Sequence, residues 1–251
     1  MPVGAFDRPI IRKAIKQWRD KAKSTPRASD MGLQALSRVL SYGVDDGVLT
    51  MNACAGISHL YTNDRADVIW TTEDLEALEL GKPDDTGHRT GAAAPEIVWA
   101  AKLAALTGLR KSDLLRLSWG HIKPLSIEIR TGKSGGKKTT LIPLYGDLRA
   151  VLDFIPKRST TVLTNTEGAA WGSGFNSSWQ RAIKRIGVDK HFHDLRGTAA
   201  TRMFMADLTI REIAEIMTWS EDQVERLITR YVKRDEILRD RIRRMDRRDP
   251  A

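Results

Sequence analysis

Six polar or aromatic side chains in the C-terminal part of the chain occupy places where an apolar core residue is expected. His193 and Arg196 lie three residues apart in FHDLRGTAATRM, at the expected start of an apolar helix, so both would share one face of that helix. Two cations on one face require a negatively charged partner. The complete set is Arg110, Lys133, His193, Arg196, Trp219 and Tyr231.

Taken singly, each of these side chains has an ordinary structural explanation. Arg110 follows a helical pattern and can interact with the dipole at the end of that helix. Lys133, in a hairpin, can be solvated, and His193 can be a hydrogen-bonded structural histidine. Trp219 and Tyr231 can simply pack in the core.

Taken together, the six side chains suit attack on a phosphodiester. Arginine presents a planar fork of donors that matches two phosphate oxygens, and two forks can hold the extra negative charge of a five-coordinate phosphorane. A tyrosine oxygen can attack to give a covalent phosphoenzyme, and nearby cations favour its phenolate form. A lysine on a hairpin can protonate the departing sugar oxygen. The set therefore predicts Arg110 and Arg196 on the phosphate, Tyr231 as the nucleophile and Lys133 as the general acid.

No metal or other cofactor is expected for this chemistry. The sequence contains neither HExxH nor a P-loop, and it has no tight carboxylate cluster of the two-metal type. Cys54 is the single cysteine, which excludes both an intrachain disulfide and a zinc site built from cysteines.

The elements that must position these residues are helices around one β-hairpin. EIVWAAKLAALTG (96–108) predicts an almost wholly apolar helix ended by Gly108, and the next helix is expected to begin with Ser112 as its N-cap. LSIEIR and TTLIPL predict two strands joined by TGKSGGKK. Capping boxes at Thr209 with Glu212 and at Ser220 with Gln223 predict the starts of two later helices.

The first part of the chain predicts a separate small helical unit. Two helical patterns, with STPRAS between them, run through residues 1–60, and the polar segment 61–70 is expected to be a linker. A capping box of Thr71 with Asp74 opens the larger part, 71–251, in which residues 81–95 are expected to form a loop. The predicted fold is mainly α-helical with a small antiparallel β-sheet, in two parts.

The overall charge favours a polyanionic partner. The 251 residues carry 41 basic and 32 acidic side chains, a formal net charge of +9, and the pI is near 9.8. The N-terminus lacks the basic and apolar segments of a secretory signal, and no stretch approaches the ~18 apolar residues of a membrane span. We expect a cytoplasmic protein with no membrane association.

From about residue 65 to 235 the sequence resembles the catalytic domain of the tyrosine recombinases, the phage integrase family. LTGLRKSDLLRLSW resembles the first arginine box of that family, IRTGKSGGKKTTLIPL its β-hairpin, and HDLRGTAAT its second box. The resemblance implies a role for each motif residue. The implied roles are Arg110 and Arg196 as catalytic arginines, Asp113 as the acid that orients the site, Lys133 as the catalytic lysine, His193 as the histidine of the H-x-x-R pair, Trp219 as the residue at the histidine-or-tryptophan position and Tyr231 as the nucleophile.

The resemblance also implies the partners. Residues 1–60 resemble part of the family's core-binding domain, which together with the catalytic domain clamps double-stranded DNA. Strand exchange is expected from a homotetramer on two duplexes, with a monomer when free. The basic C-terminal tail of the 71–251 domain, VKRDEILRDRIRRMDRRDPA, is expected to be helical, either packed on its own domain or docked on a neighbouring protomer.

Three other functions remain open from the residues alone. A type IB topoisomerase uses similar chemistry as a monomer, although the short chain, the first helical unit and Trp219 favour a recombinase. A recombinase that has lost turnover would bind DNA without cutting it. A basic structural or regulatory protein would bind duplex DNA with no role for Tyr231.

Overall fold

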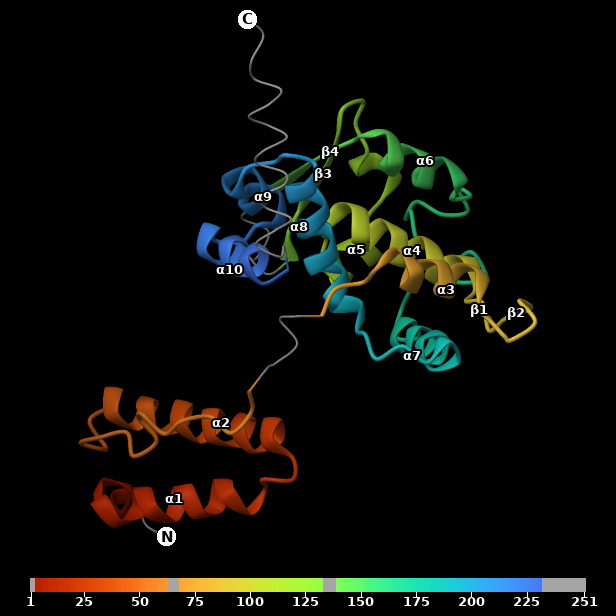
Figure 1. The fold of residues 1–251 in the computed structure, drawn as a ribbon. Coiled ribbons are helices and arrows are strands. Elements are labelled where there is room, and N and C mark those ends of the chain that lie inside the picture. Colours follow the sequence, from red (N-terminus) through yellow and green to blue (C-terminus); the bar gives the residue numbers. More distant parts are fainter. Residues whose placement is uncertain (1–2, 63–67, 133–138, 232–251) are drawn as a thin grey trace, which may run out of the picture. The chain divides into compact units, whose positions relative to one another are not determined.

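The computed structural model describes residues 3–62, 68–132 and 139–231, with only the backbone of Tyr231 at the last position. The contacts divide the chain into two compact units, Met1–Asp64 and Arg65–Ala251 (Figure 1). The division falls inside the segment 61–70. At the end of that segment, Trp70 is already buried in the larger unit, where its backbone N–H donates to Thr198 Oγ1 at 2.7 Å.

The smaller unit is a pair of helices closed by a loop. A 3₁₀ turn, Val3–Asp7, leads into α1 (Pro9–Lys21), which packs against α2 (Pro26–Asp45). Proline stands at the first turn of both helices, where its missing N–H costs no intrahelical bond. The buried apolar residues come from both helices and from the loop after α2. They are Ile11, Ile15, Leu33, Leu40, Leu49, Ala53, Cys54 and Ile57.

The larger unit is built around α4 (Pro95–Thr107). This helix is apolar on nearly every side, so it is stable only when other elements cover it all round. It contacts α3, α5, α6, α7 and α8, and α10 packs on α8 and α9 (Figure 1). The helices of this unit besides α4 are α3 (Thr72–Leu80), α5 (Lys111–Leu115), α6 (Gly146–Phe154), α7 (Phe175–Ile186), α8 (Leu195–Met205), α9 (Ile210–Met217) and α10 (Glu221–Tyr231), with 3₁₀ turns at Trp119–His121 and Phe192–Asp194.

The predicted β-hairpin is present. Strands β3 (Ser126–Arg130) and β4 (Thr139–Pro143) pair antiparallel, with Ser126 opposite Pro143 and Arg130 opposite Thr139. The alternation buries Ile127, Ile129 and Ile142 on one face. Thr140 Oγ1 donates to the Ile216 carbonyl at 2.7 Å, which joins the hairpin to the end of α9. The mainly helical fold with a small antiparallel sheet is therefore confirmed.

Two local predictions were wrong. The helix after Gly108 begins at Lys111 with Arg110 as its N-cap, because the Asp113 and Leu114 N–H groups donate to the Arg110 carbonyl at 2.9 and 2.8 Å. Ser112 therefore lies inside the first turn. The expected loop 81–95 contains a short antiparallel pair, β1 (Lys82–Pro83) with β2 (Arg89–Thr90). The three predicted capping boxes, by contrast, all form.

Candidate active site

Two helix C-termini meet at the centre of the site. Gly108, which ends α4, has φ 65° and lies against α9: a Cβ at this position would stand 2.2 Å from Met217 Sδ. Only glycine allows both this left-handed conformation and this approach. The last carbonyls of a helix lack intrahelical partners and carry partial negative charge. The meeting point of α4 and α9 is therefore prepared for a buried cation.

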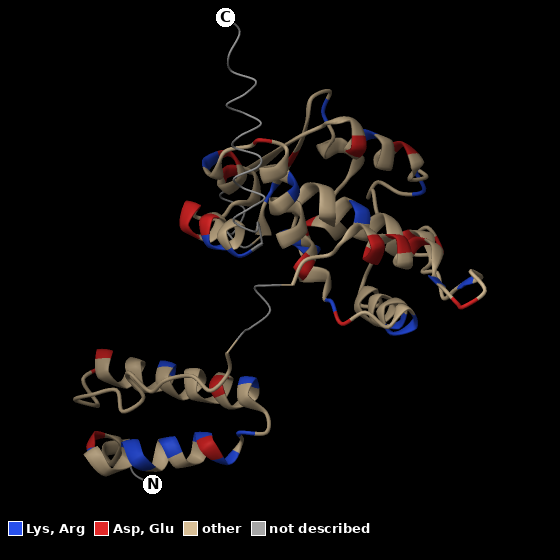
Figure 2. Ribbon diagram, viewed as in Figure 1, with Lys and Arg blue, Asp and Glu red and all other residues tan. Residues whose placement is uncertain are grey.

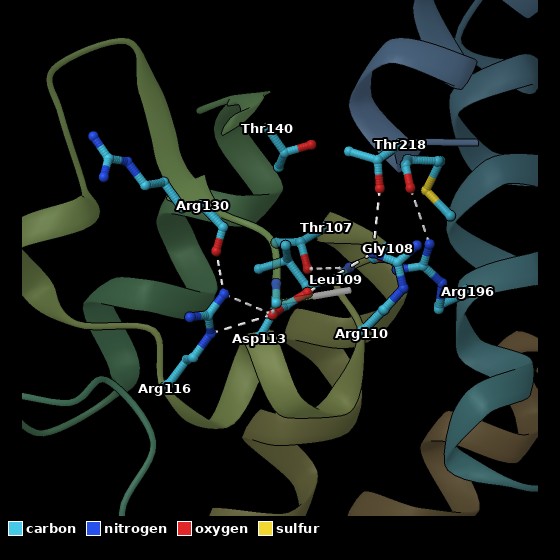
Figure 3. A network of polar contacts seen from close by, with 12 residues as sticks. Thr107, Gly108, Leu109, Arg110, Asp113, Arg116, Arg130, Thr140, Arg196 and Thr218 are labelled. Carbon is cyan, nitrogen blue, oxygen red and sulfur yellow. Dashed lines mark hydrogen bonds and ion pairs between the residues drawn. The ribbon is translucent and has the colours of Figure 1, made fainter. Parts of the chain in front are cut away.

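Arg196, near the start of α8, supplies that cation (Figure 3). Its Nη1 donates to the Gly108 carbonyl, and its Nη2 donates to the Met217 carbonyl at 3.0 Å. Arg196 as a whole residue is 4% exposed. Burial, with the positive charge of Arg110 nearby, lowers the pKa of the Arg196 guanidinium to about 9, while Asp113 acts in the opposite direction. The group is therefore charged at neutral pH at an energetic cost.

Arg110 joins Arg196 from the other side of this meeting point. Its Nη1 donates to Thr218 Oγ1 at 3.2 Å and lies 4.0 Å from Asp113 Oδ2 (Figure 3). As the N-cap of α5, Arg110 has an extended backbone that directs the chain away from α4. The sequence prediction that the two arginines converge therefore agrees with the observed geometry.

Asp113 connects Arg110 to the β3–β4 hairpin. The carboxylate is almost fully buried, and its Oδ1 accepts from Arg116 Nη2 at 2.8 Å and from the Gly132 N–H at 3.0 Å. Arg116 Nη2 also donates to the Arg130 carbonyl (Figure 3). Asp113 Oδ2 has no hydrogen-bond partner and faces Arg110. Asp113 therefore fixes the end of β3 relative to the first arginine.

His193 lies in the 3₁₀ turn just before α8 and its side chain is solvent-accessible. Partial burial of the ring, together with the positive charges of Arg196 and Arg110, lowers the pKa of the imidazole below 6.5. The charge of Asp194 acts in the opposite direction. His193 is therefore neutral at pH 7, and it lies within electrostatic reach of both arginines.

Trp219 stacks on the second arginine. The Arg196 guanidinium carbon lies 5.1 Å from the centroid of the Trp219 ring. A ring face attracts a cation without neutralising its charge. Trp219 thus holds Arg196 in place and leaves its positive charge available.

Two predicted residues cannot be placed as side chains. Lys133 lies outside the described residues, directly after Gly132, the last described residue before this gap. The backbone of Tyr231 ends α10, which packs on α8 and α9. The side chain of Tyr231 lies outside the described part of the chain. The tail 232–251 also lies outside the described residues.

Three contributors to this site were missed by sequence reasoning. Gly108 was predicted only as a helix terminator, although its carbonyl holds Arg196. Thr218 and Arg116 were not singled out at all. Their contacts depend on which backbone ends meet in the fold, and the local sequence carries no signal for that. Among the described residues, no group of three or more histidine, cysteine, aspartate or glutamate side chains is placed to hold a metal ion.

Comparisons with known sequences match the part of the chain that contains this site. The phage integrase family matches residues 86–236. The shufflon-specific DNA recombinase of Escherichia coli is 32% identical over 126 residues, a match that covers 45% of this chain and 29% of that protein. This chain therefore aligns with less than a third of the length of that relative.

Solved structures show the same fold at low identity. A lambda integrase (75–356) dimer bound to a COC′ core site has a TM-score of 0.66 at 19% identity, covering 84% of this chain and 79% of that one. The Tn1549 transposon integrase (82–397) in complex with circular intermediate DNA has a TM-score of 0.66 at 14% identity, covering 96% of this chain and 86% of that one. In the part of the chain that the structure describes, no helix is both long and apolar enough to cross a bilayer. Because the family match spans more than half of the chain, the protein belongs to the phage integrase family, the tyrosine recombinases.

Proposed function

We propose that the protein is a site-specific DNA recombinase that cuts and rejoins DNA through a 3′-phosphotyrosine intermediate. One observation carries the proposal: Arg110 and Arg196 converge at the ends of α4 and α9, with no carboxylate hydrogen-bonded to either guanidinium among the described residues. Two adjacent cations in a partly buried site attract an anion. A DNA phosphate is an anion of the right shape for two guanidinium forks.

In the proposed cleavage step, the phenol oxygen of Tyr231 attacks the scissile phosphorus. The bond from phosphorus to the tyrosine oxygen forms as the bond from phosphorus to the 5′ oxygen breaks. Arg110 and Arg196 bind the non-bridging oxygens and stabilise the charge of the phosphorane. A guanidinium has five N–H groups, so the two bonds from Arg196 to carbonyls leave donors for the phosphate.

Proton transfer falls to the remaining residues. Lys133 donates a proton to the departing 5′ oxygen, and neutral His193 assists removal of the proton from the attacking phenol. Asp113 and Trp219 position the two arginines. The phosphotyrosine keeps the free energy of the phosphodiester, so attack by a 5′-hydroxyl of a partner strand restores the backbone without ATP.

The proposed partner is double-stranded DNA in the cytoplasm. We assign residues 1–60 to part of a core-binding domain, 61–70 to a linker and 71–251 to the catalytic domain. We also propose that strand exchange uses four protomers on two duplexes, the free protein being a monomer. The DNA-bound lambda integrase dimer supports this assignment by fold alone, as does a lambda integrase tetramer on a Holliday junction with 19% identity and a TM-score of 0.64, covering 83% of this chain and 64% of that one.

The distribution of charge supports the same partner. Figure 2 shows Lys and Arg along α1, whereas Asp and Glu gather on α3. Lys13 and Lys16 on α1 are exposed, and four acids, Glu73, Asp74, Glu76 and Glu79, lie on α3. We expect DNA affinity to fall roughly 10³-fold or more between 50 and 200 mM salt, as for a protein with at least six phosphate contacts. An affinity independent of salt would contradict a clamp built on phosphate contacts.

Trapping the covalent intermediate tests the proposal. A pool of duplexes randomised around a nick lets the short 5′-hydroxyl fragment escape after cleavage, so the protein stays attached to the DNA it prefers. We expect the wild type to form an adduct that survives denaturation and Tyr231→Phe to form none. Tyr145→Phe is the matched control, because the Tyr145 hydroxyl donates to the Leu106 carbonyl at 3.0 Å and is expected to play no part in cleavage.

Each alternative function gives a different result. If the protein forms the adduct and relaxes supercoiled plasmid but never joins two duplexes, it is a type IB topoisomerase. Duplex binding with no adduct in the wild type indicates a protein that only binds DNA. An adduct that survives Tyr231→Phe places the nucleophile elsewhere.

The role of Lys133 is tested with a substrate whose 5′-bridging oxygen is sulfur. A thiolate leaves without a proton, so Lys133→Ala should cleave this substrate nearly as fast as the wild type and cleave normal DNA much more slowly. Equal defects on the two substrates would show that Lys133 is not the general acid. Lys137→Ala, from the same segment, is the matched control and should show neither defect.

A further inference from the structure

Thr218, between α9 and α10, has an unusual backbone conformation. Its φ is 53° and its ψ is 42°, in the left-handed region. Among the described residues, Asp207 (φ 66°) is the other non-glycine residue with a positive φ. Aspartate tolerates this region, whereas a β-branched residue such as threonine is strained there.

The backbone bonds at this turn do not require a threonine. The Thr218 N–H donates to the Glu215 carbonyl at 3.3 Å, and the Trp219 N–H donates to the Ala214 carbonyl at 3.0 Å. Helices commonly end in this way, with glycine at the left-handed position. Glycine would make the same bonds without the strain, so the reason for a threonine must lie in its side chain.

The side chain has one specific partner. Thr218 Oγ1 accepts a hydrogen bond from Arg110 Nη1 at 3.2 Å, and in the described parts of the chain it is the hydrogen-bond acceptor of that guanidinium (Figure 3). Asp113 Oδ2 lies 4.0 Å from the same nitrogen, beyond hydrogen-bonding distance. The orientation of Arg110 therefore depends on the Thr218 hydroxyl.

A hydroxyl suits this task better than a carboxylate. A carboxylate hydrogen-bonded here would largely neutralise the guanidinium, whereas a neutral oxygen directs it and adds no negative charge to that of Asp113, which lies 4.0 Å away. The neighbouring residues treat Arg196 in the same way, through the Met217 carbonyl and the Trp219 ring. Residues 217–219 thus orient both arginines without neutralising either.

We propose that Thr218 is a positioning residue for DNA cleavage, and that its strained conformation persists because its hydroxyl holds Arg110 toward the scissile phosphate. The proposal rests on the function proposed above, in which Arg110 binds that phosphate. It predicts that relieving the strain with glycine leaves the fold at least as stable and makes cleavage slower.

The test compares three substitutions at Thr218 with one matched control. Single-turnover cleavage is measured on DNA recovered from the trapped adducts, together with DNA affinity and melting temperature. Thr218→Gly and Thr218→Val should cleave roughly tenfold or more slowly, the cost of one hydrogen bond to a charged group, with affinity within about twofold of wild type. Thr218→Ser keeps the hydroxyl and should restore most of the rate. Asp207→Gly removes a positive-φ side chain away from the arginines and should cleave at the wild-type rate.

The outcomes separate this inference from the proposed function. A wild type that forms no adduct overturns both. A wild type that cleaves, with Thr218→Gly or Thr218→Val cleaving equally fast, overturns the role of the hydroxyl alone. A melting temperature of Thr218→Gly several degrees below wild type overturns the claim of strain. Slow cleavage with unchanged affinity and undiminished stability, together with rescue by Thr218→Ser, supports the inference.

Discussion

Arg19 and Arg196 are both buried arginines, one in each unit, and their surroundings differ. Arg19 is 9% exposed and donates through Nε and Nη2 to Asp20 Oδ1 at 2.9 and 2.7 Å, and through Nη1 to the Ser58 carbonyl. Arg196 is 4% exposed and bonds only neutral carbonyls among the described residues, with the charges of Arg110 and Asp113 nearby.

The difference distinguishes an arginine with a structural role from one that is placed to bind a ligand. The charge of Arg19 is balanced by an adjacent carboxylate, so its bonds tie α1 to the loop after α2 and nothing further is needed. The charge of Arg196 is not balanced by a hydrogen-bonded carboxylate. Asp113, 4.0 Å from Arg110, supplies one negative charge beside two cations, so a bound anion would stabilise the site further. Burial and pairing distinguish the two arginines, although residue type does not.

The largest expected effect is on cleavage by Arg196→Lys. Lysine keeps the charge and loses the planar fork, so cleavage should fall roughly 10²-fold, as when one transition-state donor is lost. Arg19→Lys is the matched substitution in the other unit. It should destabilise that unit by about 1–3 kcal/mol and leave cleavage by the folded protein unchanged. Cleavage rates of Arg196→Lys equal to those of Arg19→Lys would remove the distinction between the two arginines.

The next effect concerns the helix end that holds Arg196. Gly108→Ala must bear both a positive φ and overlap with Met217, whereas Gly47→Ala in the smaller unit has a φ of 72° and no atom within 4 Å. We expect Gly47→Ala to cost about 1–2 kcal/mol and Gly108→Ala to cost about 1–3 kcal/mol more, from overpacking. Calorimetry of both variants measures this. Equal losses would mean that Met217 moves aside freely and that the contact between α4 and α9 is loose.

The smallest effect is a pH dependence carried by His193. Because its pKa is lowered, the neutral ring persists to a pH below 6.5 before protonation removes its ability to accept a proton. Cleavage should therefore stay level from pH 8 to about 6.5 and decline severalfold only below the ordinary histidine pKa. His193→Gln should cleave more slowly at neutral pH and should not show this decline in rate at low pH. If His193→Gln keeps the decline at low pH, the titration belongs to another group.

The sequence predicted the parts of the site that local pattern encodes. Arg110, His193 and Arg196 stand at predicted helix ends, one of them marked by Gly108. The expectation that they converge came from their combined chemistry and from the resemblance to the tyrosine recombinases. The capping boxes at Thr209 and Ser220 gave the starts of α9 and α10 for the same reason.

The remaining contacts depend on tertiary structure. Thr218 orients Arg110 only because α9 ends beside α5 in space, and Arg116 reaches the Arg130 carbonyl only because β3 returns beside α5. Ser112 had the right residue type for a cap, but the chain already turns at Arg110, where the carbonyl accepts two N–H groups. Residue type cannot reveal which backbone ends become neighbours.

The most direct test is to locate the attachment point of the trapped DNA. The adduct is digested with nuclease and protease, and the peptide that carries the residual nucleotide is sequenced by mass spectrometry. We expect a nucleotide joined through its 3′-phosphate to Tyr231. Attachment at Tyr145 or at a serine, or linkage through a 5′-phosphate, would contradict it.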